Sequence, residues 1–532
     1  MNPIQNKPLH TKDIGSRSEF LREDKSELIK RLLAEKRMRE NGLQRMSYNQ
    51  ESLWIINQTF EGNTAYNVGF AVKITSKFDV EVFRKVFQEK VDFHQILRTN
   101  FVIQDDVPCQ KINTHQEVII HQIEASGWTR EDVYKSLKLT YQLPFDLENE
   151  PVFRIHVFKV NDDETILLLN FHHIAVDAYS LVLLVQEILE SYDSFENFTL
   201  FRNSQVDESY INFVKKQQQI ILGEEGKKLK KYWQNQLLGE IPTLNLPNDQ
   251  QRPALPSLFG NKITFELNRG LYLSLKAFSK ANNCTLYTTL LSIFQVFLYR
   301  ISGQDDIIVG SPVSSGRLNA NFSKSIGHFV NLLPMRADFT ESKDFVGFLK
   351  TNKETILSAF QHQEYPFLQL VKDLDLPRNT NVSPVFQVLF NYLNLEGVGE
   401  IKKLFMPNPN EEAYSYKNLT LIPLDLPQLE GQYDTSLELC DDGEKMVGLW
   451  KYNTQLFSHE RAEQLLSYFQ NILNEIVENP TNNIDDLSLL NPETQLKLLS
   501  HHCHTFRDYS FASTLVSMFE RSVACHPTSI AL

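Results

Sequence analysis

The segment from residue 165 to 195 constrains the fold more than any other part of the chain. It begins with the apolar run TILLLNF (165–171), which predicts a buried strand. The residues YSLVLLVQEILESYDSF (179–195) have the apolar spacing of an amphipathic helix. A buried strand that leads directly into a helix indicates a mixed α/β fold.

A loop with the sequence HHIAVD (172–177) joins this strand to the helix. Functional side chains favour such loops, because the flanking elements fix the backbone while the loop opens onto a cleft. Since neighbouring strand residues face opposite sides, we expect only one of His172 and His173 to face a shared site. The structural alternative is a pair of buried core histidines, with Asp177 capping the helix.

Composition limits the possible functions. A chain of 532 residues that is 42% hydrophobic exceeds the size of a single core, so two or more lobes are expected. The net charge of −13 argues against a nucleic-acid partner, which needs a basic face. We find neither a run of about eighteen apolar residues nor a signal-peptide core, which predicts a cytoplasmic protein without a membrane partner.

The cysteines and histidines predict no metal site. Cys109, Cys284, Cys440, Cys503 and Cys525 are scattered without a CxxC pair, as expected for reduced thiols. The cluster HHCH (501–504) is too closely spaced to encircle one ion easily, and a solvated linker is expected there. No glycine-rich phosphate loop is found, so ATP is not expected to be a substrate.

Several further motifs follow the chain in order. They are LQRMSYNQESLW (43–54), GNTAYN (62–67), FHQILRT (93–99), YINF (210–213), YW (232–233), GSPV (310–313) with Arg317, IGHFVN (326–331) ending at Arg336, HQEYPF (362–367) and SPVFQV (383–388). Together with HHIAVDA they resemble the blocks of nonribosomal peptide synthetase condensation domains, and the resemblance runs from Leu43 to Leu490.

The resemblance implies a pseudo-dimer of two chloramphenicol-acetyltransferase-like α/β sandwich lobes around a central channel. The expected divisions are a polar leader with a linker helix (1–42), an N-terminal lobe (43–226), a C-terminal lobe (227–490), and a linker with the start of an adenylation domain (491–532).

The leader helix is expected at Ser26–Arg39, and either packs on the first lobe or docks a carrier. The second lobe is expected to contain a helical segment at 271–301 and a strand at 306–309. Residues 485–490 (DDLSLL) are similar to the strand that closes a condensation domain.

The chemistry implied by the family is amide formation between two thioesters. The amine of an acceptor aminoacyl group attacks the carbonyl of a donor acyl or peptidyl group, and no protein nucleophile is needed. The chain itself binds no cofactor, because partner donor and acceptor carrier proteins supply the 4'-phosphopantetheine arms. With Met1 as the natural start the donor carrier acts in trans, while an adenylation domain and a carrier follow in cis in the intact enzyme.

The resemblance also assigns roles within the loop. His173 orients the amine, takes its proton or donates to the tetrahedral oxyanion, and these roles remain open. Asp177 is expected to hold the loop by pairing with Arg98, or alternatively with Arg336. His172 is expected to shape the loop.

The chain departs from the family's motifs at three positions, and three further residues are candidates for the channel wall. Ala178 replaces the family's glycine; it either strains a left-handed backbone or begins the helix without cost. Phe93 and Gln95 replace the arginine and glutamate of the RHExLRT block, as in a divergent member. The candidates for the channel wall are Ser311, Asn331 and Gln387.

Within the family, the opening blocks resemble the subtype that joins an L-configured donor to an L-acceptor. A starter-type N-acylating domain and a catalytically impaired interaction platform remain alternatives. An epimerisation domain and a free acyl-CoA acyltransferase share the HHxxxD motif and are further rivals.

Overall fold

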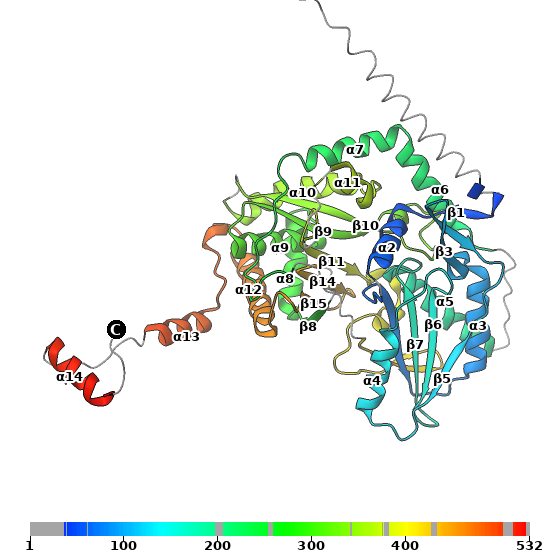
Figure 1. Cartoon of the computed structure of the whole chain (residues 1–532), viewed down its shortest axis with the longest axis horizontal. Helices are drawn as coiled ribbons and strands as arrows, with labels where there is room; N and C mark the ends of the chain where they lie inside the picture. Colours follow the sequence, from blue (N-terminus) through cyan, green and yellow to red (C-terminus); the bar gives the residue numbers. More distant parts are fainter. Residues whose placement is uncertain are drawn as a thin grey trace, which may run out of the picture.

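The computed structural model of the chain describes residues 37–38, 40–60, 62–196, 206–253, 259–340, 343–374, 376, 382–426, 433–503 and 514–527. Two six-stranded sheets, each covered by helices, form its body (Figure 1). The mixed α/β prediction is therefore confirmed. Nearly all of the predicted leader helix Ser26–Arg39 lies outside the described residues.

The first sheet has the strand order β12-β13-β2-β7-β6-β5, and we call it with its helices the first lobe. Strand β7 is apolar at successive positions because both of its faces are buried. Leu167, Leu169 and Phe171 pack with helices α3 and α5 on one face, whereas Ile166 and Leu168 pack with α4 on the other. The strands are β2 (Asn67–Ile74), β5 (Ile120–Glu124), β6 (Phe153–Lys159), β7 (Thr165–His172), β12 (Tyr414–Tyr416) and β13 (Leu419–Leu424), and the helices are α3 (Val80–Phe93), α4 (Arg130–Tyr141) and α5 (Ala178–Glu196).

The second sheet has the order β10-β9-β11-β14-β15-β8, and with its helices forms the second lobe. Its core contains rings of Phe294, Phe297, Trp450 and Phe469 in mutual contact. The strands are β8 (Gly260–Glu266), β9 (Asp306–Ser314), β10 (Val330–Asp338), β11 (Val388–Asn394), β14 (Thr435–Asp441) and β15 (Met446–Asn453), and the helices are α8 (Arg269–Ala281), α9 (Leu286–Ser302), α10 (Phe345–Gln361), α11 (Phe367–Leu374) and α12 (His459–Glu478).

Two local predictions in the second lobe need correction. The segment predicted as helical at 271–301 forms two helices, α8 and α9, bent by 105°. The break occurs because Asn283 adopts a left-handed conformation (φ 52°) and Thr285 caps α9. Residues 485–490 form no strand. Ile484–Asp486 is the 3-10 turn η5, in which the Asp485 amide donates to the Asn483 side chain.

The predicted boundary between the lobes at residues 226 and 227 does not hold for β12 and β13. These strands belong by sequence to the range 227–490, yet β13 pairs antiparallel with β2, from Leu421 opposite Ile74 to Leu424 opposite Ala71. They occupy the edge of the first sheet, because β2 has a free side there and backbone pairing does not depend on sequence distance. The C-terminal part of the chain therefore contributes two strands to the first lobe.

The remaining elements surround or leave this body. Helices α6 (Ser209–Leu222) and α7 (Glu224–Gln236) lead from the first lobe to the second, and α13 (Pro492–Cys503) and α14 (Leu515–Cys525) extend away from both (Figure 1). Helix α2 (Tyr48–Thr59) lies beside a small sheet of three strands, β1 (Leu43–Arg45), β4 (Val107–Ile112) and β3 (Thr99–Gln104). Strand β3 directly follows the 3-10 turn η1 (Gln95–Arg98). The other 3-10 turns are η2 (Ser315–Leu318), η3 (Glu396–Val398) and η4 (Glu400–Leu404).

A search of the described helices for a membrane span finds no single helix that is long and apolar enough. The bent pair α8 and α9 meets the criterion only when its two helices are taken together.

Candidate active site

The HHxxxD loop lies between the end of β7 at His172 and the start of α5 at Ala178. As the strand alternation predicts, the two histidines face different environments. His172 is buried edge-on against Phe145, and its Nδ1 accepts a hydrogen bond from the Ile174 amide at 3.1 Å. His173 instead lines a cavity. Its backbone amide is fixed by donating to the Tyr66 carbonyl at 2.8 Å.

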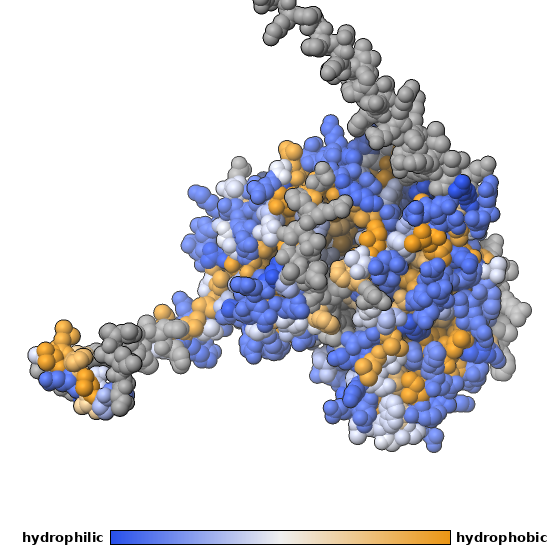
Figure 2. Space-filling view, in the orientation of Figure 1, coloured by the Kyte–Doolittle hydropathy of each residue, from blue (hydrophilic) through white to orange (hydrophobic). Residues whose placement is uncertain are grey.

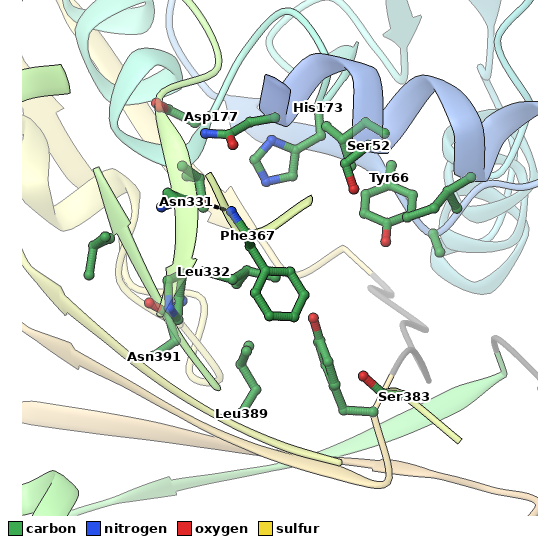
Figure 3. A pocket seen from close by; sticks show the side chains of 18 of the residues that line it. Ser52, Tyr66, His173, Asp177, Asn331, Leu332, Phe367, Ser383, Leu389 and Asn391 are labelled. Atoms are coloured by element: carbon green, nitrogen blue, oxygen red, sulfur yellow. Dashed lines mark hydrogen bonds between the residues drawn. The ribbon is translucent and has the colours of Figure 1, made fainter. Parts of the chain in front are cut away.

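This cavity has a volume of about 1060 Å³ and is lined by residues from both lobes. The volume is at the upper end of the range for sites that enclose a small molecule. Figure 3 shows His173 and Asp177 at one side of the cavity and Leu389, Asn391 and Ser383 across from them. The loop therefore faces the second sheet across a space that can hold more than one reacting group.

Arg317 is the partner of Asp177. Its Nη2 donates to Asp177 Oδ1 at 3.1 Å, and both side chains are largely buried. The same carboxylate accepts from the amides of Ser180 at 2.6 Å and Phe329 at 3.0 Å. Because Arg317 belongs to η2 of the second lobe, this pair connects the loop to the opposite lobe.

The predicted pairing of Asp177 with Arg98 or Arg336 is therefore wrong. Arg98 donates to the backbone carbonyl of Asn113. Arg336 forms a two-pronged pair with Asp306, with contacts of 2.9 and 2.7 Å. Both guanidinium groups bind residues of their own lobes, and Arg317 is the arginine that pairs with Asp177.

Burial and charge set the protonation of the loop. Burial acts to raise the pKa of Asp177, but Arg317 and the two amides outweigh it, so the pKa lies below its ordinary value. Burial lowers the pKa of His172 to about 3. Burial also lowers the pKa of His173, although the Asp177 charge acts in the opposite direction. An ionised carboxylate and neutral imidazoles are therefore expected near pH 7.

His328 also lines the cavity and faces His173. The two Nδ1 atoms are 3.2 Å apart, and the rings meet edge to face with centroids 4.8 Å apart. Burial, followed by the proximity of His173, lowers the pKa of His328 well below its ordinary value. His328 lies within the IGHFVN block, but the motif gave no reason to pair it with a residue 155 positions away.

Ala178 is the first residue of α5 and lines the cavity. It is not among the described residues with positive φ, so the unstrained alternative applies. Asn331 and Gln387 line the cavity as predicted. Asn331 Oδ1 accepts from the Phe367 amide, shown dashed in Figure 3, and thereby fixes the start of α11.

Ser311 does not line the cavity. It lies behind Tyr287, whose hydroxyl donates to the Ser311 hydroxyl at 2.8 Å, while Ser311 itself donates to the Phe390 carbonyl. Tyr287 is the residue that reaches the cavity from this position. Alternation along β9 could have suggested that a neighbour of Ser311 faces inward, but not that a helix side chain covers it.

Gln50 lies within the LQRMSYNQESLW block, but the sequence did not indicate its supporting role. It is fully buried in α2, and its side-chain amide donates to the Ile174 carbonyl at 3.0 Å. In the part of the chain that the structure describes, no group of three His, Cys, Asp or Glu residues could hold a metal ion. The side chains of the cluster at 501–504 lie outside that part.

Comparisons with known proteins agree with this architecture. A family profile described as "Condensation domain" matches residues 41–499. Surfactin synthase subunit 1 of Bacillus subtilis (strain 168) is 33% identical over 454 residues, and bacitracin synthase 3 of Bacillus licheniformis is 29% identical over 522 residues. These alignments cover 85% and 98% of this chain but only 12% and 8% of the two relatives, so the chain spans a small part of their length.

A solved structure shows the same fold. The crystal structure of a four-domain nonribosomal peptide synthetase bound to AMP and glycine superposes with a TM-score of 0.79 at 23% identity, covering 85% of this chain and 34% of that one. The predicted two-lobe pseudo-dimer is thereby confirmed. The family match, the relatives and the fold together show that this chain belongs to the condensation domain family, the amide-bond-forming, acyltransferase-type domains of nonribosomal peptide synthetases.

Proposed function

We propose that this chain joins an acyl or peptidyl group on a donor carrier to the amine of an aminoacyl group on an acceptor carrier. The amine nitrogen bonds to the donor carbonyl carbon, the carbon–sulfur bond breaks, and the donor carrier is released as a thiol. The observation that carries this proposal is the placement of His173 on a cavity of about 1060 Å³ between two lobes.

The cavity supports a mechanism based on positioning. Two thioesters held in line within it would react as if at very high concentration, without a covalent intermediate on the protein. Two phosphopantetheine arms from partner carriers, rather than a cofactor bound by this chain, would bring the thioesters to His173. The neutral imidazole can accept a proton from the attacking amine, which is the role we assign to it.

Asp177 serves this reaction indirectly. Its two oxygens are occupied by Arg317 and by the amides of Ser180 and Phe329, so it holds the loop against the second lobe. His172 is buried behind the loop and supports its backbone through the Ile174 amide. Both residues position His173, and neither is assigned a contact with substrate.

The C-terminal segment supports the proposal that an adenylation domain follows in cis. Helix α14 exposes the side chains of Leu515 (84%), Val516, Phe519 and Val523, visible as an orange patch at the end of the molecule in Figure 2. The alignment with bacitracin synthase 3 covers 98% of the chain and so continues past the family match, which ends at residue 499. We assign residues 491–532 to the linker and the start of that domain, and residues 1–42 to the leader.

The proposed subtype, an L-donor joined to an L-acceptor, is supported by the opening sequence blocks. A test is single-turnover amide formation with separately loaded donor and acceptor carriers, followed by mass spectrometry of the product. We expect product with an L-aminoacyl or L-peptidyl donor, none with the matching D-donor, and none when either carrier is omitted. ATP-dependent amino-acid activation and phosphopantetheinylation of this chain are both expected to be absent.

The same assay separates the alternatives. A starter-type domain would use a loaded fatty acyl group in place of the aminoacyl donor. A free acyltransferase would work equally well with a CoA-bound donor, and an epimerisation domain would invert a carrier-bound residue without forming an amide. Carrier binding without any product would establish a non-catalytic platform and overturn the proposed function.

A further inference from the structure

His328 is held in place by bonds on both sides of it in the sequence. The Gly327 carbonyl accepts from the Asp177 amide at 3.1 Å and from the Ser180 hydroxyl at 2.6 Å. The next amide, that of Phe329, donates to the Asp177 carboxylate. The backbone of His328 is therefore fixed relative to the HHxxxD loop, although it comes from the second lobe.

The contact between the two Nδ1 atoms restricts where protons can lie. In a pair of neutral imidazoles, a hydrogen bond between these atoms requires one of them to carry hydrogen and the other to be bare. If His173 donates, its Nε2 is unprotonated and can accept a proton. If His328 donates, His173 Nε2 carries hydrogen and can only donate.

The proposed reaction requires the first arrangement. In that reaction the imidazole of His173 takes the proton of the attacking amine, so one of its ring nitrogens must be bare. Nδ1 of His173 contacts Nδ1 of His328, which leaves Nε2 for the amine. Nδ1 of His173 therefore carries the hydrogen, and Nδ1 of His328 accepts it.

We propose that His328 is a positioning residue whose Nδ1 accepts the Nδ1 hydrogen of His173 and keeps Nε2 of His173 bare toward the reacting amine. The proposal rests on the proposed function, in which His173 takes the proton of the amine. The amine proton passes to Nε2 as the carbon–nitrogen bond forms. It then passes to the sulfur of the departing thiol, which restores the neutral pair.

Other charged and titratable groups face this pair. Asp177 and His172 act on it from the loop and from β7, and Arg317 reaches Asp177 from η2. The Tyr210 hydroxyl of α6 donates to the His328 carbonyl at 3.0 Å. The variants described next change none of these groups, so differences between them report on the His328 side chain.

Two substitutions separate ring packing from hydrogen-bond acceptance. His328→Phe keeps an aromatic ring against His173 but has no acceptor. His328→Asn loses the ring but can place its amide oxygen where Nδ1 lies. In full-length protein labelled with ¹⁵N-histidine, we expect the wild type and His328→Asn to show His173 as the Nδ1–H form. We expect His328→Phe to show a mixture of both forms.

The kinetic test uses the same proteins with saturating loaded carriers. His328→Phe should lower kcat by about 10-fold while leaving KM for both carriers unchanged, the effect of one lost hydrogen bond. Without its acceptor, His173 becomes less basic, so the midpoint of the acid limb of kcat should move to lower pH. His328→Asn should restore both quantities.

A wild-type spectrum with hydrogen on Nε2 of His173 would overturn the proposal, as would a folded His328→Phe protein with unchanged spectrum and midpoint. Equal defects in the two variants would show that the ring, not the acceptor, matters. The spectra require no substrate. If the wild type forms no amide but shows the expected proton position, the proposed function fails while the positioning role of His328 stands.

Discussion

The chain builds a strand–loop–helix unit in each lobe, and the two units differ in chemistry. β7 continues into α5 through the HHxxxD loop, and β15 continues into α12 through residues 454–458. Each strand lies between two antiparallel neighbours: β7 between β2 and β6, and β15 between β8 and β14. Both units contribute to the cavity wall, through His173 in the first and Leu456 in the second.

The two loops are fastened differently. The first is buried and bound across the lobes by the Asp177–Arg317 pair. The second is held by Asp249, whose carboxylate accepts from the Ser458 amide and hydroxyl and from Arg461 near the surface. Residues 454–458 (TQLFS) include no titratable side chain. Both loops therefore form part of the cavity wall, but only the HHxxxD loop provides side chains that can take part in the reaction.

Removing the chemistry of the first loop should have the largest effect. His173→Ala should lower amide formation by roughly 10²- to 10⁴-fold, as expected for a lost proton acceptor. Gln455→Ala, at an exposed position on the second loop, is the matched control and should stay within about twofold of wild type. Single-turnover kinetics measures both. Near-wild-type turnover in His173→Ala would contradict the proposal that the HHxxxD loop, and not residues 454–458, provides the chemistry.

Removing Asp177 or Asp249, the carboxylates that hold the two loops, should affect stability to different extents. Asp177→Ala leaves a buried guanidinium unpaired and should lower the free energy of unfolding by about 3–5 kcal/mol. Asp249→Ala breaks a more exposed set of bonds and should cost about 1 kcal/mol. Urea unfolding at pH 7 measures both. Equal losses would contradict the idea that the first loop depends on a cross-lobe ion pair.

Acid should destabilise the first loop through His172. Its folded pKa of about 3 lies below the ordinary value of 6.5, so below pH 6.5 the unfolded chain binds a proton that the native loop excludes. Stability therefore falls as the pH decreases, by about 2–3 kcal/mol between pH 6.5 and 4.5 from this group.

The variant His172→Asn keeps an acceptor for the Ile174 amide but has no titration in this range. Its free energy of unfolding should fall less steeply with acid than that of wild type, measured by urea unfolding at several pH values. Parallel curves for the two proteins would place the acid sensitivity outside the loop.

The smallest effect is expected at the position where the family has glycine. Ala178 begins α5 without a positive φ, so Ala178→Gly should destabilise the protein by at most about 1 kcal/mol and leave turnover within about twofold. Thermal unfolding and the condensation assay measure these quantities. A large gain in turnover would show that alanine obstructs the cavity.

Local patterns predicted the elements that carry the site. The apolar run and the helical spacing gave β7 and α5 nearly to the residue, because strand and helix periodicities are properties of neighbouring residues. Alternation in the same strand predicted that only one of His172 and His173 faces the cavity, and the family resemblance supplied the choice of His173.

Contacts between distant segments could not be predicted in this way. Arg317 and His328 both lie in recognised blocks, yet their partners Asp177 and His173 lie 140 and 155 positions away. The choice among Arg98, Arg317 and Arg336 depends on how the lobes face each other. That arrangement is a property of the whole fold, as is the crossing of β13 to the first sheet.

The crossing of β13 also affects how the chain folds during synthesis. Ile74 in β2 pairs with Leu421, about 350 residues later, so at roughly 5–20 residues per second the partner strand leaves the ribosome about 17–70 s after β2. During that interval one edge of β2 has no partner and can pair with another nascent chain. The first lobe is thus made first but completed late, and the cell must keep it apart from its neighbours until the second lobe has been translated.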